Sequence, residues 1–240
     1  MGAHVRKPLP LLLALLWLPL PGHADGGWSA LVALTSDYVD RGISQTYGGG
    51  ALQLGGNYQS AFGWFVGAWG SNVDPYPGGA SFNELDVYGG MKWPVAADFT
   101  VQAAYAHYAY LEDPRPGHYD YDEFSLGIAY LDLLSATVSY QPDSTAYTQL
   151  GFAQRRTTLA GELSARWPLR AGFAVTCGAG YYDLHDLFGV GYWAGNAGLE
   201  YVHRRLSVTV NRFFSDSTAA RLYEDASANR TWVVSGVWRF

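Results

Sequence analysis

Several charged residues of this sequence lie two or four positions apart, inside stretches where polar and apolar residues alternate. The pairs are Asp37 and Arg41, Glu84 and Asp86, and Glu162 and Arg166, while Glu123 and Glu200 stand singly in similar stretches. Residues two or four apart share one face of an extended strand. The spacing therefore predicts carboxylates and guanidinium groups on one face of a sheet. There they could pair in a hydrogen-bonded network or set the charge of a water-filled space.

The histidines do not form a pattern that would support catalysis. His107 is expected alone on the apolar face of its segment, His118 and His185 in loops, and His203 at a turn. None has a serine two residues later, which a nucleophile and base on one strand face would need. His185 with Asp186, and Glu84 with Asp86, only vaguely resemble catalytic or metal-binding pairs. Zinc spacing, phosphate loops and nucleotide fingerprints are missing. We therefore expect a non-enzyme without metal or cofactor.

Composition narrows the class of protein. Of 240 residues, 16% are aromatic and only 15% are charged, against roughly a quarter charged in a typical soluble domain. The formal net charge of −6 and the absence of a basic cluster make nucleic acid a poor partner. Cys177 is the single cysteine, so no internal disulfide forms, and we expect a small buried apolar side chain.

The first 24 residues have the features of a secretory signal peptide. Arg6 and Lys7 precede a leucine-rich stretch from Leu11 to Leu20, and Gly22-His23-Ala24 is a small-x-small cleavage site. The apolar run is too short for a permanent membrane anchor. We expect cleavage after Ala24 and export of residues 25–240.

The last segment, Arg230 to Phe240, has the clearest alternation. Trp232, Trp238 and Phe240 share one face, and Arg239 lies on the other. Outer-membrane β-barrels of Gram-negative bacteria commonly end on the aromatic residue of such a strand. We expect Trp238 and Phe240 to form the signal that the barrel-assembly machinery of the outer membrane reads.

About twelve segments of alternating pattern, near ten residues each, follow from Trp28 onward. We expect strands at 28–41, 50–59, 63–73, 82–92, 98–110, 121–131, 134–142, 157–167, 172–182, 192–203, 205–214 and 230–240. The connections between them alternate between long and short. Outer-membrane barrels have long extracellular loops and short periplasmic turns, whereas the connections of a soluble sandwich vary. The pattern predicts an all-β fold: one antiparallel, up-and-down transmembrane barrel, closed by the strand that ends at Phe240.

One stretch is distinctive, from Ser36 to Thr46, reading SDYVDRGISQT. With WGSN at 69–72, ELDxYGG at 84–90 and Tyr108-x-Tyr110, it resembles the TorF-like family of outer-membrane porins, long catalogued as conserved proteins of unknown function. The resemblance implies a membrane barrel and a pore, with no established substrate. Asp40 departs from the family pattern, where this position is usually apolar or aromatic. On strand one, the alternation of faces would place Asp40 on the side that faces lipid, so we expect it at the outer rim of the barrel.

The charged residues are expected inside the barrel, because a charge on the lipid side at the midplane costs roughly 2–4 kcal/mol. They could form a constriction that selects solutes or a network that fills the lumen; for Arg41 we favour pairing with Glu84 or Asp86. Asn72 is placed among the pore-lining residues. We expect an outer-membrane porin, monomeric or weakly oligomeric, through which small hydrophilic solutes diffuse passively, with membrane lipid and the assembly machinery as partners. The alternatives are a closed barrel that has a structural role or binds a ligand through its loops and, third, a lipid-modifying hydrolase of the outer membrane.

Overall fold

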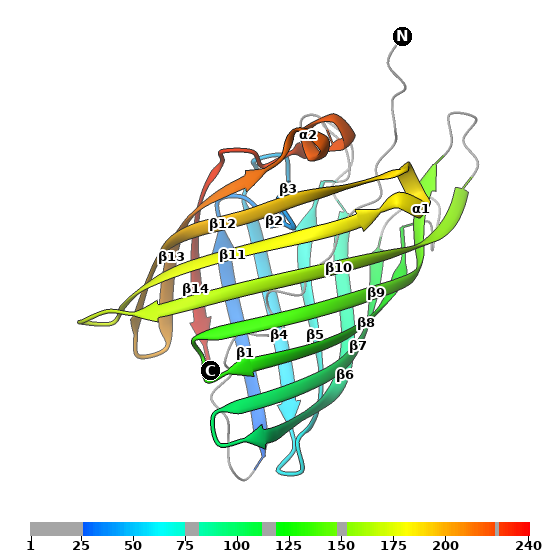
Figure 1. The fold of residues 1–240 in the computed structure, drawn as a ribbon. Helices are drawn as coiled ribbons and strands as arrows, with labels where there is room; N and C mark the ends of the chain where they lie inside the picture. Colours follow the sequence, from blue (N-terminus) through cyan, green and yellow to red (C-terminus); the bar gives the residue numbers. More distant parts are fainter. Residues whose placement is uncertain (1–25, 75–81, 112–118, 148–152, 224–225) are drawn as a thin grey trace.

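The chain folds into a closed β-barrel, described here from a computed structural model that covers residues 26–74, 82–111, 119–147, 153–223 and 226–240 (Figure 1). Twelve strands make up the wall. They are β1 Gly27–Thr35, β4 Ala51–Gln59, β5 Trp64–Val73, β6 Phe82–Ala96, β7 Phe99–Leu111, β8 Tyr121–Tyr130, β9 Leu134–Tyr147, β10 Ala153–Pro168, β11 Phe173–Leu184, β12 Val190–His203, β13 Leu206–Ser215 and β14 Trp232–Arg239. The signal peptide predicted at 1–24 and His118 lie outside the described residues.

Each strand pairs antiparallel with the next along the chain, and β14 closes the barrel against β1. At the closure Leu31 is opposite Arg239 and Thr35 is opposite Ser235. The predicted up-and-down antiparallel barrel of about twelve strands is therefore confirmed. Its two ends differ. Tight turns such as Leu131–Leu133 connect strands at one end, called here the turn end. Longer segments and two helices, α1 (His185–Phe188) and α2 (Ser217–Tyr223), lie at the other, called the loop end.

The outer surface of the wall is apolar, whereas the inner surface is polar or small, with aromatic clusters at the loop end. On β8, Phe124, Leu126 and Ile128 are exposed, whereas Glu123, directly before Phe124, is almost completely buried in the lumen. Aromatic pairs flank the band at both ends, among them Trp28 with Tyr58 at the turn end and Tyr181 with Trp193 at the loop end. Such a band between aromatic girdles is typical of membrane barrels. No helix in the described part of the chain is long and apolar enough to span a membrane.

The outward band leads to a prediction at Leu126, which lies between Phe124 and Tyr130 on β8 and is 58% exposed. In a lipid bilayer, Leu126→Arg should lower the free energy of unfolding by about 2–4 kcal/mol, because arginine at the midplane contacts hydrocarbon. Leu134→Arg is the matched control: it faces outward too, but directly after a turn, where the cost should be about 0–1 kcal/mol. Urea unfolding in liposomes measures both. Equal effects would contradict the placement of this band in lipid.

Strand one ends earlier than predicted, at Thr35 instead of residue 41. The chain then turns into the lumen, where β2 (Val39–Asp40) and β3 (Ile43–Ser44) form a small hairpin. Arg41 and Gly42 between them adopt positive φ values of 47° and 76°, which a regular strand cannot accommodate. We call residues 36–50 the plug.

Other boundaries also shift. β9 and β10 extend to residue 147 and from residue 153, so their ladder continues past the apolar band through polar residues such as Thr145, opposite Arg155. β11 and β12 likewise continue into the predicted loop at 183–191, and α1 fills the gap between them. Helix α2 occupies part of the connection predicted at 215–229. Strands β9 to β12 therefore extend the barrel wall at the loop end (Figure 1).

The plug packs against two clusters of side chains that fill the loop end of the lumen. Tyr38 belongs to one, with Trp69 and Tyr108. Ile43 belongs to the other, with Tyr192 of β12 and Tyr223 of α2. Ile43 is only 2% exposed, and burying such a side chain stabilises a fold by about 1.5–3 kcal/mol. The plug is therefore part of the packed interior.

Candidate functional site: the plug and its lumen network

The plug is fixed at its base by the carboxylate of Asp37. Its Oδ1 accepts hydrogen bonds from the hydroxyls of Ser44 at 2.5 Å and Thr46 at 3.0 Å. The Thr46 hydroxyl oxygen also accepts a bond from the amide of Tyr38 at 3.1 Å. Asp37 is thus buried and bonded within the plug, rather than on the interior face of strand one as predicted.

The tip of the plug is anchored to the segment before the last strand. The amide of Ala228 donates to the carbonyl of Gly42 at 2.9 Å, and Ile43 forms an isolated β-bridge with Ser227. Gly42 also lies so close to the wall that a Cβ added there would be 2.5 Å from Cβ of Ala194. Only glycine fits this position, because it combines a positive φ with close approach.

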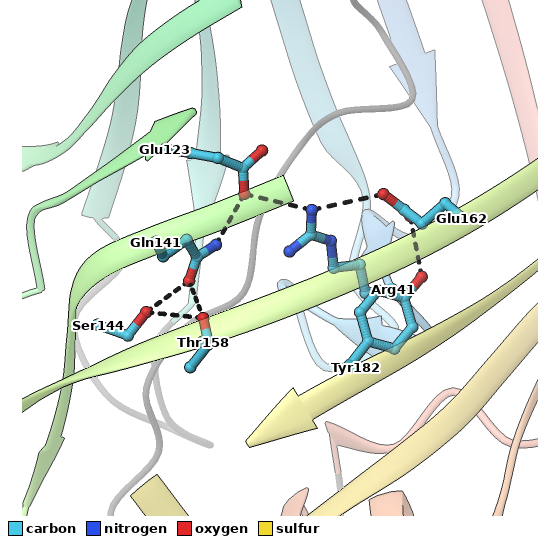
Figure 2. A network of polar contacts seen from close by, with 7 residues as sticks. All are labelled: Arg41, Glu123, Gln141, Ser144, Thr158, Glu162 and Tyr182. Atoms are coloured by element: carbon cyan, nitrogen blue, oxygen red, sulfur yellow. Dashed lines mark hydrogen bonds and ion pairs between the residues drawn. The ribbon is translucent and has the colours of Figure 1, made fainter. Parts of the chain in front are cut away.

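Arg41 connects the plug to the far wall (Figure 2). Its Nη2 lies 3.3 Å from Oε2 of Glu123 on β8 and 3.4 Å from Oε2 of Glu162 on β10. The guanidinium carbon lies 5.3 Å from the centre of the Tyr182 ring, and the Tyr182 hydroxyl donates to Oε1 of Glu162 at 2.9 Å. We call this set of contacts the Arg41 clamp. Both ion-pair distances exceed the 2.7–2.9 Å that is usual for strong charge-assisted bonds.

A chain of neutral groups supports Glu123 from behind (Figure 2). Nε2 of Gln141 donates to Oε2 of Glu123 at 2.9 Å, and Oε1 of Gln141 accepts from Ser144 at 2.5 Å and Thr158 at 2.7 Å. Because both hydroxyls donate to Oε1 of Gln141, the NH₂ group of the same amide points toward Glu123. The carboxylate is therefore held in position for Arg41 by β9 and β10.

The predicted pairing of Arg41 with Glu84 or Asp86 is wrong. Glu84 instead accepts hydrogen bonds from the hydroxyls of Tyr38 at 3.1 Å and Tyr110 at 3.0 Å. The reason is the inward turn of the plug, which carries Arg41 away from the face of β1 and across the lumen. Glu84 and Asp86 remain buried in the interior, as the alternation of side chains along their strand predicted.

Asp40 is the other charged residue at the plug tip. It was expected at the outer rim on the lipid side, but it is only 6% exposed and lies in the inward hairpin. Burial raises the pKa of its carboxyl well above the usual range. Arg41 opposes this rise, while the neighbouring carboxyl groups of Glu162 and Glu84 add to it. The tip of the plug is therefore in an electronegative environment.

Arg166 and Glu200 lie inside the barrel as predicted, but near the turn end and apart from the clamp. Nε of Arg166 donates to Glu200 at 2.7 Å, and Nη1 contacts Asp132 at 3.2 Å. Asn72 lies on the outer side of β5, where its amide bonds the backbone of Leu52 and Gly50. Its placement in the lumen was therefore wrong, because β5 starts its alternation with Trp64 facing outward.

His107 is on the outer face as predicted, but it is not alone. Nδ1 lies 2.8 Å from Oδ1 of Asp122 on the neighbouring strand, and the Tyr105 hydroxyl donates to the same oxygen at 2.7 Å. The register of β7 and β8 places His107 opposite Asp122, which spacing within one strand could not reveal. In the described ranges, no group of three or more His, Cys, Asp or Glu side chains could hold a metal ion. Cys177, expected to be buried, is exposed on the outer face.

A small cavity opens beside Arg41 at the loop end. Its volume is about 40 Å³, enough for about two or three waters. Polar and aromatic side chains surround it, including Arg41, Gln141, Ser144, Tyr121, Tyr182 and Tyr192. The cavity is thus a small, partly polar space next to the Arg41 clamp.

The base of the plug provides a test of how firmly it is held. Asp37→Ala should loosen residues 36–50, because the buried hydroxyl of Ser44 loses its acceptor, at a cost of about 1–3 kcal/mol. The expected result is faster proteolysis within the plug while the barrel stays intact. Asp37→Asn is the control, since its Oδ1 can still accept both bonds. Equal protection of all three proteins would contradict this role.

The family of the chain follows from a comparison of its sequence with family profiles. Residues 23–238 match the family described as "Bacterial protein of unknown function (Gcw_chp)". The chain belongs to the Gcw_chp family. The match spans the whole barrel, and it carries no porin name, so the finer TorF-like assignment stays a prediction. A search of curated proteins found no match for this Gcw_chp member.

Solved structures of porins share the fold of this Gcw_chp protein. The KdgM porin superposes with a TM-score of 0.52 at 12% identity, covering 88% of this chain and 99% of KdgM. The NanC porin superposes with a TM-score of 0.57 at 9% identity, covering 88% of this chain and 98% of NanC. At these identities the likeness extends to the fold, a porin-like barrel.

Proposed function

We propose that this Gcw_chp protein is an outer-membrane channel through which small hydrophilic solutes diffuse passively. The loop end of the barrel would then face the extracellular side, and the predicted signal peptide would direct export of the chain. The outward apolar band with its aromatic girdles supports a place in lipid, because charged or polar wall residues would be costly there. Membrane lipid and the barrel-assembly machinery are the partners that this location implies.

The observation that carries the proposal is the polar, small-residue lumen on the turn side of the Arg41 clamp. Its inward positions include Ser135, Ser164, Gly178, Asn196 and Thr209. The hydroxyls of Ser135 and Ser164 lie 2.6 Å apart and are exposed, and the Arg166 side chain retains 27% exposure. Groups like these keep water in a lumen, whereas a purely structural barrel could fill it with apolar side chains.

The clamp is then the narrowest part of the path. It joins β8, β10 and the plug through one guanidinium group, and the small cavity lies on its extracellular side. A pore selects by the width and charge of such a constriction. The earlier alternatives for Arg41, a constriction and a structural network, therefore coincide in one set of contacts.

A closed barrel with a role in binding through its loops is the second candidate, because the plug, α2 and two aromatic clusters occupy the loop end. Planar-bilayer recordings of the refolded mature chain and swelling of liposomes in small sugars separate the two. The channel predicts discrete conductance steps and swelling. Folded protein without either would favour the closed barrel.

The lipid-modifying hydrolase receives little support. The pair of His107 and Asp122 faces lipid, as such an enzyme would need, but no Ser or Cys in the described strands shares a hydrogen bond with His107. A base without a nucleophile does not perform acyl transfer. Release of fatty acid from phospholipid by the purified protein would overturn this assignment.

A further inference from the structure

Charge is unevenly distributed along the lumen. Six carboxyl groups lie at the loop end: Asp37, Asp40, Glu84, Asp86, Glu123 and Glu162. At this end, Arg41 is the one described arginine or lysine with a buried side chain, at 6% exposure. Carboxyl groups therefore outnumber the guanidinium group at this end.

The turn end has the opposite balance. Lys92, Arg166 and Arg239 point inward there, with Glu200 as the inward carboxylate. Arg166 is paired with Glu200, while Arg239 donates to the hydroxyl of Ser207 at 2.9 Å and Lys92 lies over the ring of Phe65. The acidic character is therefore a property of the extracellular half and not of the lumen as a whole.

Several oxygens of the acidic half have no hydrogen-bond partner among the described residues. They are Oδ2 of Asp40, Oδ1 of Asp86 and Oε1 of Glu123. All three side chains are more than nine-tenths buried, with exposures of 6%, 3% and 1%. A buried carboxylate oxygen requires a donor or a positive charge nearby. Each of these atoms is thus an unused acceptor beside the constriction.

We infer that the channel admits cationic solutes in preference to anionic ones, with the carboxylates around the clamp as its charge filter. This inference rests on the proposed channel function and specifies its solute class. Carboxylate rings of this kind attract cations and repel anions at a constriction. Because the described carboxylates are not grouped as metal ligands, the cations are expected to pass and not to be retained.

The test is the reversal potential of the wild-type channel in planar bilayers under a tenfold KCl gradient. We expect K⁺ to be favoured over Cl⁻ by about fivefold or more. Asp86→Asn should reduce that ratio by half or more, since it replaces a lumen carboxyl group by an uncharged amide of the same shape. Asp122→Asn is the matched control: it makes the same change at the same end, but on the outer face of the wall, and it should leave the ratio unchanged.

The outcomes separate the inference from the proposed function. Conductance with equal permeabilities or with Cl⁻ favoured would overturn the cation preference and leave the channel standing. An unchanged ratio in Asp86→Asn, or an equal fall in Asp122→Asn, would also overturn it. If Asp86→Asn does not fold, the permeability ratio of Glu84→Gln, compared with that of the wild type, decides whether the cation preference holds. Folded protein without conductance would overturn the channel and this inference together.

Discussion

Arg41→Ala is expected to raise the single-channel conductance roughly twofold or more, because it removes the side chain that we propose as the constriction of the channel. The same change leaves Glu123 and Glu162 without their shared cation. The preference for K⁺ over Cl⁻ should therefore rise, not fall. Planar-bilayer recordings in symmetric and graded KCl measure both quantities.

The loss of the Arg41 clamp should also weaken the plug. Glu123 is only 1% exposed, and removing one partner of a buried ion pair typically costs about 3–5 kcal/mol. Arg41→Ala combined with Glu123→Gln separates the two effects, because it removes the uncompensated charge but keeps the widened lumen. The double variant should recover stability and retain the higher conductance.

Arg166→Ala is the control for Arg41→Ala. It deletes the same side chain near the turn end, where the guanidinium pairs with Glu200 and Asp132 outside the constriction. Its conductance should stay close to wild type. If Arg41→Ala gave a wild-type conductance and selectivity in a folded barrel, the constriction role of Arg41 would be lost.

Phe240→Ala should strongly reduce the amount of folded protein in the outer membrane. Phe240 follows β14, its amide donates to the carbonyl of Ala30 at 2.9 Å, and its ring is 60% exposed on the outside. Losing the ring forfeits about 1.5–3 kcal/mol of burial in the membrane, and it removes the terminal aromatic residue that we propose as the assembly signal with Trp238. Heat-modifiable migration of the membrane fraction measures the folded amount.

Phe62→Ala is the matched control for Phe240. Phe62 is 83% exposed in a tight turn of the same end, so it loses a similar ring at a similar depth but not on the terminal strand. It should assemble almost normally. Equal yields of the two variants, whether both high or both low, would contradict a specific role of the terminal residue in assembly.

The architecture could be predicted from the sequence because the alternation of side chains with period two is a local property. The limit of that method is clear at residues 36–46. Their polar and apolar residues continue to alternate beyond Thr35, although the positive φ values at Arg41 and Gly42 end any regular strand. The pattern therefore predicted one long strand where the chain forms a short strand and an inward hairpin.

The partners within the site could not be predicted for a related reason. The alternation of side chains along each strand correctly placed Glu84, Glu123 and Glu162 in the lumen. It contains no information about which of these carboxylates Arg41 contacts. That depends on the direction of the plug across the barrel. In the same way, the contact of His107 with Asp122 depends on the register between two strands, and single-strand spacing contains no information about register.

The anchoring of the plug has a consequence for biogenesis. The hydroxyl of Ser36 accepts a bond from the amide of Val234, 198 residues later, and the Gly42 carbonyl accepts one from Ala228. The plug and these attachment points therefore lie far apart in the sequence. Contacts so distant along the chain form late in folding. A folding barrel therefore fixes its plug only when the seam between β1 and β14 is made, and an intermediate without that seam would have an unanchored plug.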